Sequence, residues 1–313
     1  MSISQHSLIK PVPQGSWDTH LHIFEPDRYS FSNERHFTPA PATLEQLELF
    51  EKSVGIDHVC IAHGLSFGSD CTSLLAYLEY FKGKARGICV LDVEDVTDGM
   101  LNTYHAAGVR SVRIDFFKPK AMDDLDLQIS LIQKTAQRLM LWGQHRWSIQ
   151  IQQPHLEHWH KLAPLAAELS VPLVVDHFAL FQAPSMRPDQ IQSTDDDFAF
   201  EEMDGFEQLV AALRHGNTWI KLSAPYRCSD LFPNFDDLES LVRLLVRANR
   251  HRVVWGSDWP HTQRHKDRIG KSSCQQEAFL KIEDATWIKS LSRWMSEEEW
   301  NLMWIVNPST LYY

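Results

Sequence analysis

The stretch Asp18-Thr-His-Leu-His22 ends the first segment of the chain that is typical of a β-strand, Gly15–His22. His20 and His22 are two residues apart, so both side chains point to the same face of an extended strand. A doubly wound open sheet carries a glycine-rich phosphate-binding turn after its first strand, and this stretch has none. The stretch therefore favours a closed barrel, with the two histidines at one end of its first strand.

Strand-like and helix-like segments alternate along the rest of the chain. The former are short and rich in β-branched residues, whereas apolar residues recur every three or four positions in the latter. Further strands are expected at His58–Ala62, Ala85–Leu91, Ser111–Ile114, Ser148–Gln152, Leu173–Asp176, Thr218–Leu222 and Val253–Gly256. Helices are expected at Thr43–Val54, Cys71–Phe81, Leu125–Leu139, Leu156–Leu169, Gly205–His215 and Phe235–Ala248. The sequence thus predicts one α/β domain over residues 1–313, a distorted (β/α)8 barrel of the TIM type.

Two segments are too long to be tight connections between a strand and a helix. Residues 181–198 are rich in Pro, Gln and Asp, and residues 261–285 are polar and rich in Lys. Both follow predicted strands, so both are expected to form loops over the carboxyl-terminal mouth of the barrel, where an active site would lie.

Composition excludes several classes of function. The net charge of -11 argues against nucleic acid or an anionic membrane as the main partner, and no window is long and apolar enough to span a membrane. The five cysteines are scattered without a CxxC pair, and the amino-terminal residues do not resemble a secretion signal. We therefore expect a cytoplasmic protein with reduced thiols that acts on a small molecule; the sequence leaves a homo-oligomer open.

Four polar residues fall at predicted strand ends, where barrel enzymes keep their reactive groups. They are His20 and His22 after the first strand, His177 after Leu173–Asp176 and Asp258 after Val253–Gly256. Each has an ordinary structural explanation, such as a helix cap, but their coincidence at one end of the barrel favours function. Three imidazoles and a carboxylate would bind one Zn²⁺, or would act without metal as a base with hydrogen-bonding partners.

Several longer motifs resemble a known family. They are Asp18-Thr-His-Leu-His-Ile-Phe24, Gly83-Lys-Ala-Arg-Gly87, Ala107-Gly-Val-Arg-Ser-Val-Arg113, Val174-Val-Asp-His177, Lys221-Leu-Ser-Ala-Pro-Tyr-Arg227, Val254-Trp-Gly-Ser-Asp-Trp-Pro-His261 and Asn307-Pro308. Together they resemble the 2-pyrone-4,6-dicarboxylate lactonase group of the amidohydrolase superfamily (amidohydrolase family 2), from about Trp17 to the carboxyl terminus. Binuclear members of that superfamily use a bridging lysine or glutamate on a central strand. Because Ser148-Ile-Gln-Ile-Gln-Gln-Pro154 has neither, a two-metal site is not expected.

The resemblance implies a hydrolase that opens a carboxylated lactone. Asp258 would take a proton from the attacking water, and the three histidines would polarise the lactone carbonyl. Arg113 and Arg227 match arginines that hold substrate carboxylates. No organic cofactor is implied, and relatives either work without metal or hold one divalent ion on the same histidines and aspartate.

The chain also departs from the lactonase pattern. Phe117-Lys-Pro-Lys120 stands where a further arginine is expected, while Gln152 and Phe37 stand at positions that carry aromatic hydroxyls in the pattern. These departures imply a less charged lactone than the pyrone dicarboxylate. Four further residues are candidates for contacting the substrate because they adjoin the motifs or follow the second strand. They are Tyr226, His261, Trp259 and Ser66.

Two other functions compete with lactone hydrolysis. One is a mononuclear zinc-dependent, non-oxidative decarboxylase of an aromatic or muconate-type acid, since such enzymes share the barrel and the ligand set. The other is a catalytically silent barrel with a binding role. Release of carbon dioxide would identify the decarboxylase, and unchanged turnover in an Asp258→Asn variant would remove Asp258 as the base.

Overall fold

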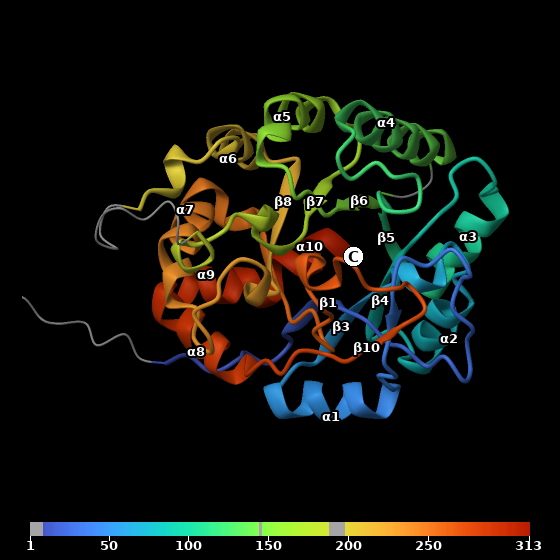
Figure 1. The fold of residues 1–313 in the computed structure, drawn as a ribbon, viewed down its shortest axis with the longest axis horizontal. Helices are drawn as coiled ribbons and strands as arrows, with labels where there is room; N and C mark the ends of the chain where they lie inside the picture. The colour runs from blue at the N-terminus through green and yellow to red at the C-terminus, as the bar shows by residue number, and fades with distance from the viewer. Residues whose placement is uncertain (1–8, 144–145, 188–197) are drawn as a thin grey trace, which may run out of the picture.

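Eight parallel strands follow one another around a single sheet, in the order β1-β3-β4-β5-β6-β7-β8-β9. The structure is a computed structural model that describes residues 9–143, 146–187 and 198–313. The first and last strands meet where His22 N donates to Trp259 O and Asp258 N donates to His20 O, both at 2.8 Å. The sheet is thereby nearly closed, and the predicted barrel is confirmed (Figure 1). Its strands are β1 (Trp17–Leu21), β3 (His58–Ala62), β4 (Ala85–Cys89), β5 (Val109–Arg113), β6 (Ser148–Ile151), β7 (Leu173–Val175), β8 (Thr218–Ser223) and β9 (Val253–Gly256).

Helices surround the barrel, as Figure 1 shows. Local signals set their ends: Thr43 forms a capping box with Gln46 at the start of α1, and Gly55 ends it with a φ of 89°. The six predicted helices are present, whereas α3 and the helices after residue 283 were not predicted. The helices are α1 (Leu44–Val54), α2 (Thr72–Tyr80), α3 (Asp98–Ala107), α4 (Leu125–Trp142), α5 (Trp159–Glu168), α6 (Phe206–His215), α7 (Glu239–Asn249), α8 (Asp284–Trp294), α9 (Glu297–Asn301) and α10 (Asn307–Tyr312).

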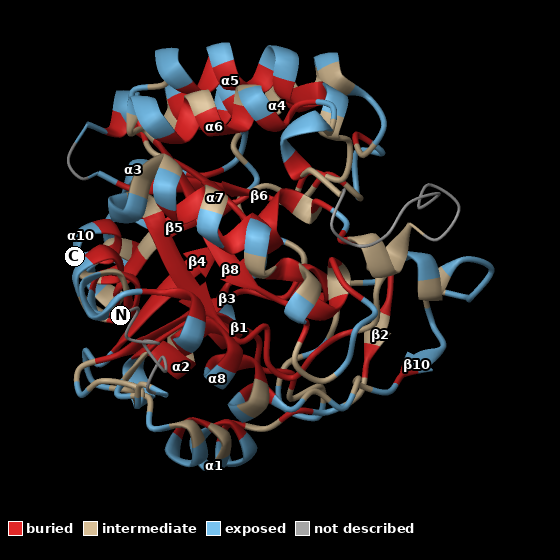
Figure 2. Cartoon of the chain, turned by 90° about the vertical axis from the view of Figure 1, so that its left-hand side faces the viewer, coloured by how far each residue is buried: buried red, intermediate tan, exposed pale blue. Residues whose placement is uncertain are grey.

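The end of α10 closes the amino-terminal end of the barrel. Tyr312 is fully buried and packs in a cluster with Cys60 and Val174, which belong to barrel strands. Arg86, at the start of β4, donates to the carbonyl of Tyr312 at 3.2 Å. Figure 2 shows the barrel strands buried beneath the surrounding helices. At the opposite, carboxyl-terminal end of the strands, residues such as Arg113 and Asp258 line a pocket.

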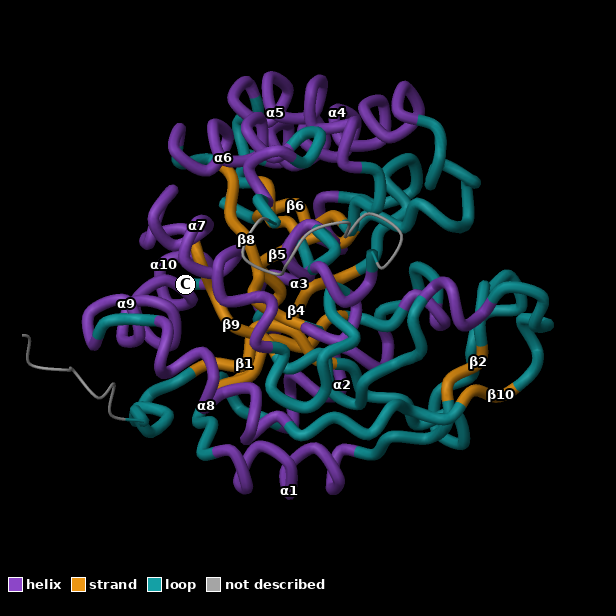
Figure 3. Tube along the Cα trace, turned by 60° about the vertical axis from the view of Figure 1, so that its left-hand side comes forward, coloured by secondary structure: helices purple, strands orange, loops and turns teal. Residues whose placement is uncertain are grey.

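Two short strands stand apart from the barrel and join two distant loops. β2 (Thr38–Pro39) pairs in parallel with β10 (Gln276–Glu277), and the pair lies to the right of the barrel strands in Figure 3. β10 and the short 3-10 helix His265–Arg268 occupy the segment 261–285 that we expected to form a loop over the mouth. Of the other expected loop, 181–198, residues 188–197 lie outside the described part of the chain.

Among the described residues, no helix has the length and apolar character needed to cross a bilayer.

Candidate active site

The four residues predicted at the strand ends meet at the mouth of the barrel. His20 lies in β1 and His22 just after it, while His177 follows β7 and Asp258 follows β9. The Nε2 atoms of His20, His22 and His177 lie 3.5, 3.4 and 3.9 Å from Oδ1 of Asp258. All four side chains are buried. We call these four residues the histidine–aspartate cluster.

The backbone holds this cluster in place at a cost in strain. His177 and Asp258 have φ values of 54° and 62°, a region that residues other than glycine seldom adopt. Such conformations cost about 1–3 kcal/mol each and persist where the surroundings enforce them. Gly256 allows the close approach of the first and last strands, because a Cβ there would lie 2.7 Å from Cβ of His20.

Each imidazole is oriented through its second nitrogen. Nδ1 of His22 lies 2.7 Å from the carbonyl oxygen of Ala62, and Nδ1 of His177 lies 2.8 Å from the hydroxyl of Ser223. Nδ1 of His20 lies 3.2 Å from a carboxylate oxygen of Asp176. These contacts leave all three Nε2 atoms directed at Asp258.

Burial keeps two of these imidazoles neutral. It lowers the pKa of His177 to about 4 and holds the pKa of His20 well below its usual value, although nearby carboxylates act in the opposite direction. Both rings therefore carry one proton each at neutral pH.

Asp258 is an ionised carboxylate with two different faces. Its Oδ2 accepts hydrogen bonds from the hydroxyl of Tyr226 and from Nη2 of Arg227, the latter at 2.9 Å. Burial alone would raise the pKa of this carboxyl, but Arg227, His177 and His22 hold it well below its usual value. Oδ1 has no hydrogen-bond donor among the described residues. It is therefore the face left for chemistry.

The cluster fits a metal ion. The ligand atoms of His20, His177 and Asp258 lie within 4.8 Å of one another, and a tetrahedral zinc site separates its ligand atoms by roughly 3.3 Å. Nε2 of His20 and Oδ1 of Asp258 are both buried without a hydrogen-bond partner in the described part of the chain, an arrangement that a shared cation or proton would satisfy. A second, partly exposed group of potential ligands lies at the start of α5: His155, Glu157 and His158.

A buried polar layer supports the cluster from below. Nζ of Lys221, on β8, donates to the carbonyl oxygen of Thr19 and to Oε1 of Gln150, both at 2.7 Å. The same ammonium lies 3.3 Å from Nδ1 of His20 and 3.8 Å from Oδ1 of Asp176. Burial by itself would raise the pKa of Asp176, but His20 and Lys221 lower it. The layer therefore carries a buried ion pair directly beneath His20.

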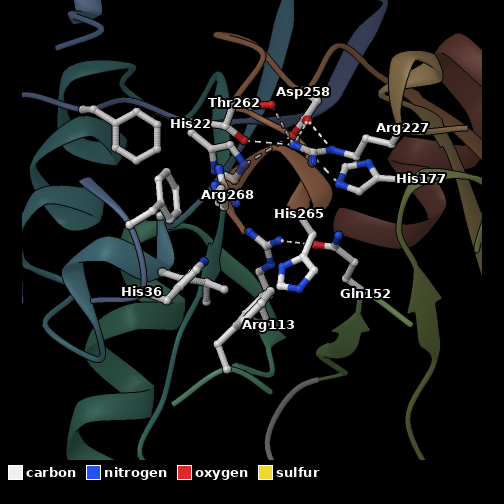
Figure 4. Close-up of a pocket in the computed structure, with 15 residues that line it drawn as sticks. His22, His36, Arg113, Gln152, His177, Arg227, Asp258, Thr262, His265 and Arg268 are labelled. Carbon is white, nitrogen blue, oxygen red and sulfur yellow. Dashed lines mark hydrogen bonds and ion pairs between the residues drawn. The ribbon is translucent and has the colours of Figure 1, made fainter. Parts of the chain in front are cut away.

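A pocket opens above the cluster, and Figure 4 shows its labelled side chains around a common space. Among the described residues, the arginines that line it are Arg113, Arg227 and Arg268, against one carboxylate, that of Asp258. Nη2 of Arg113 donates to Oε1 of Gln152 at 3.3 Å, so these two predicted residues adjoin each other. The described lining residues are His22, Phe24, His36, Phe37, Gly64, Leu65, Arg113, Phe117, Gln152, His177, Arg227, Asp258, Thr262, His265 and Arg268.

Four predicted contact residues are not among the described residues that line the pocket. Tyr226 instead binds Asp258, and Nε2 of His261 lies 3.0 Å from Asp284. The Ser66 hydroxyl donates to the carbonyl oxygen of Phe37 at 3.0 Å, and the ring of Trp259 stacks near Phe50. These four support the site from outside the pocket.

Sequence reasoning missed Lys221 and Asp176 as parts of the site, although a signal was present. Lys221 lies two residues before Ser223 and two after the buried Trp219, so strand alternation directs it into the barrel. Asp176 likewise lies two residues after the buried Val174. Reasoning also missed His36, His265 and Arg268, for which no local signal exists.

The chain is similar to a known family and to several known proteins. The amidohydrolase family matches residues 17–272. The 4-sulfomuconolactone hydrolase of Hydrogenophaga intermedia is 29% identical over 258 residues, which cover 80% of this chain and 76% of that protein. The 2-pyrone-4,6-dicarboxylate hydrolase of Comamonas testosteroni is 28% identical over 265 residues, which cover 80% and 78% of the two chains.

A solved structure shares the fold. An apo protein from Agrobacterium tumefaciens superimposes with a TM-score of 0.73 at 18% identity, covering 96% of this chain and 97% of that one. The family match spans most of the chain and includes all four residues of the histidine–aspartate cluster. The chain belongs to the amidohydrolase family.

Proposed function

We propose that this protein hydrolyses a lactone that carries an anionic group. The observation that carries the proposal is the convergence of three imidazole Nε2 atoms on one oxygen of the ionised Asp258, at the floor of a pocket lined by three arginines. The two curated relatives are named as hydrolases of 4-sulfomuconolactone and of 2-pyrone-4,6-dicarboxylate, and both names describe anionic substrates.

The reaction uses Asp258 as the general base. Oδ1 of Asp258 takes a proton from water while the water oxygen forms a bond to the lactone carbonyl carbon. The bond between that carbon and the ring oxygen then breaks, and the ring oxygen takes the proton back from Asp258. In this mechanism the Ser223 hydroxyl, 2.8 Å from Nδ1 of His177, is the donor of that hydrogen bond. Nε2 of His177 then keeps its proton and stabilises the lactone carbonyl oxygen by a hydrogen bond.

Arg227 links substrate binding to the strength of the base. Its guanidinium lines the pocket and also binds Oδ2 of Asp258, where it lowers the pKa of the carboxyl. A substrate carboxylate or sulfonate that takes a hydrogen bond from Arg227 would weaken this ion pair. The pKa of Asp258 would then rise toward that of an effective base.

His20, His177 and Asp258 are the residues that would hold a divalent ion, with His22 beside them. When bound, such an ion would act as a Lewis acid and assist the deprotonation of water. Elemental analysis of protein purified without a metal-chelating tag measures whether the active protein contains it.

A lactone panel tests the proposal. We would follow proton release at constant pH and identify the products by mass spectrometry, with 4-sulfomuconolactone, 2-pyrone-4,6-dicarboxylate and neutral lactones as substrates, before and after adding Zn²⁺ or Mn²⁺. Hydrolysis adds one water to the substrate and releases an acid without loss of carbon. Carbon dioxide release would overturn the proposal in favour of a decarboxylase, and so would the absence of turnover on the whole panel.

A further inference from the structure

The outer side of the pocket is built from loops rather than strand ends. His36 and Phe37 come from the segment after β1, Phe117 from the segment after β5, and His265 and Arg268 from the segment after β9. We call these five residues the loop wall. The ring of His36 stacks on that of Phe117 at 4.1 Å, and Phe117 approaches the ring of His265 at 5.7 Å.

Arg268 is the charged member of the loop wall, and it is anchored on two sides. Its Nε donates to Oε2 of Glu277, in β10, at 2.9 Å. Its guanidinium carbon lies 3.9 Å from the centre of the Phe37 ring, the arrangement of a cation–π contact. Phe37 directly precedes β2, so the pairing of β2 with β10 brings the two anchors together.

One end of the guanidinium is left unsatisfied. Nη2 of Arg268 is buried and has no hydrogen-bond partner among the described residues. A buried charged donor without an acceptor is costly, and an arginine presents a flat pair of donors that matches a carboxylate or sulfonate. Burial and the charge of Arg227 lower the pKa of Arg268, although Glu277 acts in the opposite direction.

We propose that Arg268 is a specificity-determining residue that binds an anionic group of the lactone, a carboxylate or a sulfonate, on the side of the pocket away from His177. This inference rests on the proposed function and deepens it. In Figure 4, Arg268 lies among the labelled pocket residues together with Arg113 and Arg227. Arg227 is tied to Asp258 and Arg113 contacts Gln152, so Arg268 is a third cation, supplied by a different loop.

The neighbouring His36 does not replace this charge. Burial, with the charges of Arg268 and Arg113, lowers the pKa of His36 to about 3, so this ring is neutral at physiological pH. His36 therefore presents an uncharged face to the pocket. His36 therefore adds no charge that would distinguish anionic from neutral lactones, whereas the arginines of the pocket do.

The test compares charged and neutral forms of one ring. We would measure kcat and KM of wild type, Arg268→Met and Arg268→Lys with 4-sulfomuconolactone, 2-pyrone-4,6-dicarboxylate and the dimethyl ester of the latter. For Arg268→Met we expect KM to rise by about 10- to 100-fold for the charged lactones, with kcat and the KM of the diester within about twofold. Arg268→Lys should restore part of the loss.

Two further variants separate binding from structure. Arg268→Met combined with Glu277→Gln avoids leaving Glu277 buried without its partner, and it should show the same rise in KM. Arg264→Met is the matched control, because Arg264 lies in the same loop but pairs with Asp230 and Asp267 outside the pocket. An unchanged KM in Arg268→Met, or equal losses on charged and neutral substrates, would overturn the assignment.

If no lactone of the panel is turned over, a binding measurement tests the anion subsite independently of catalysis. Wild type, the Arg268→Met/Glu277→Gln double variant and Arg264→Met would be titrated with citrate by calorimetry. Binding that is at least about tenfold weaker in the double variant alone would keep the anion subsite while the lactonase proposal fails. Equal binding in all three, or none in the wild type, would overturn the subsite as well.

Discussion

The loop wall and three members of the histidine–aspartate cluster, His22, His177 and Asp258, line the same pocket but are built in different ways. The cluster lies at the ends of barrel strands, and its contact atoms are fixed by hydrogen bonds to neighbouring strands. The loop wall consists of side chains from three connections that meet through ring stacking and through the cation–π contact of Arg268 with Phe37. The reacting groups are thus carried by the rigid part of the fold, whereas substrate discrimination falls to the loops.

Substitution of Asp258, in the histidine–aspartate cluster, should have the largest effect on activity. We expect Asp258→Asn to lower kcat by about 10²- to 10⁴-fold, because the base is lost while asparagine tolerates the left-handed backbone at this position. Steady-state kinetics on the best lactone of the panel measures the loss, and thermal unfolding verifies that the variant folds. Turnover equal to that of the wild type would show that the histidine–aspartate cluster does not contain the reacting groups.

A substitution of Lys221 tests whether the polar layer beneath the cluster stabilises the barrel. Replacing Lys221 by Met leaves Asp176 buried without its cation, which should lower the free energy of unfolding by about 3–5 kcal/mol. Denaturant unfolding measures this loss, and adding Asp176→Asn to the variant should recover part of it. A loss below about 1 kcal/mol would mean that the ion pair does not stabilise the barrel.

Ser223 tests the orientation of one imidazole. Ser223→Ala removes the hydrogen bond to Nδ1 of His177 and should lower kcat by about 10- to 100-fold with little change in KM. Ser111→Ala is the control, since that buried strand serine bonds to the carbonyl oxygen of Ser148 instead. Equal kinetics in the two variants would contradict a positioning role for Ser223.

The pH dependence of stability in a His36 variant tests whether the loop wall excludes water from the His36 ring. Its pKa of about 3 in the folded protein lies below the ordinary value of 6.5, so the unfolded chain binds the extra proton as the pH falls. The free energy of unfolding should therefore fall by about 2 kcal/mol between pH 7 and pH 5 because of this residue alone. Denaturant unfolding at both pH values should show a smaller loss for His36→Asn than for wild type.

The exposed His265 provides the control for that experiment, because it lies in the same wall. His265→Asn, measured at both pH values, shows how much of any change comes from removing a ring of the loop wall rather than from the titration of His36. A pH response of His36→Asn equal to that of the wild type would show that the His36 ring is hydrated and that the wall is open.

The strands and the cluster were predictable because both follow from periodicity. The predicted bounds of His58–Ala62 and Val253–Gly256 match β3 and β9, and alternation placed His20 and His22 on one face. Lys221 followed the same alternation, but a fully buried lysine in a barrel is rare enough that the pattern alone did not identify it.

Arg268 could not be predicted, because its place depends on a contact between segments far apart in the sequence. β2 and β10 are two residues long each and carry no repeating pattern. The departures from the lactonase pattern at Phe37, Gln152 and Phe117 favoured a less charged substrate. The structure places all three around the pocket together with Arg268, a cation that those departures did not reveal.

The pairing of β2 with β10 has a consequence for how such proteins diversify. β2 and β10 pair with each other, so the segments that follow β1 and β9 form one structural unit although they lie far apart in the sequence. Grafting a relative's loop into one segment alone would leave an unpaired strand and separate Arg268 from Phe37. New substrate ranges should therefore arise, in evolution or by engineering, through paired exchange of both segments on an unchanged barrel.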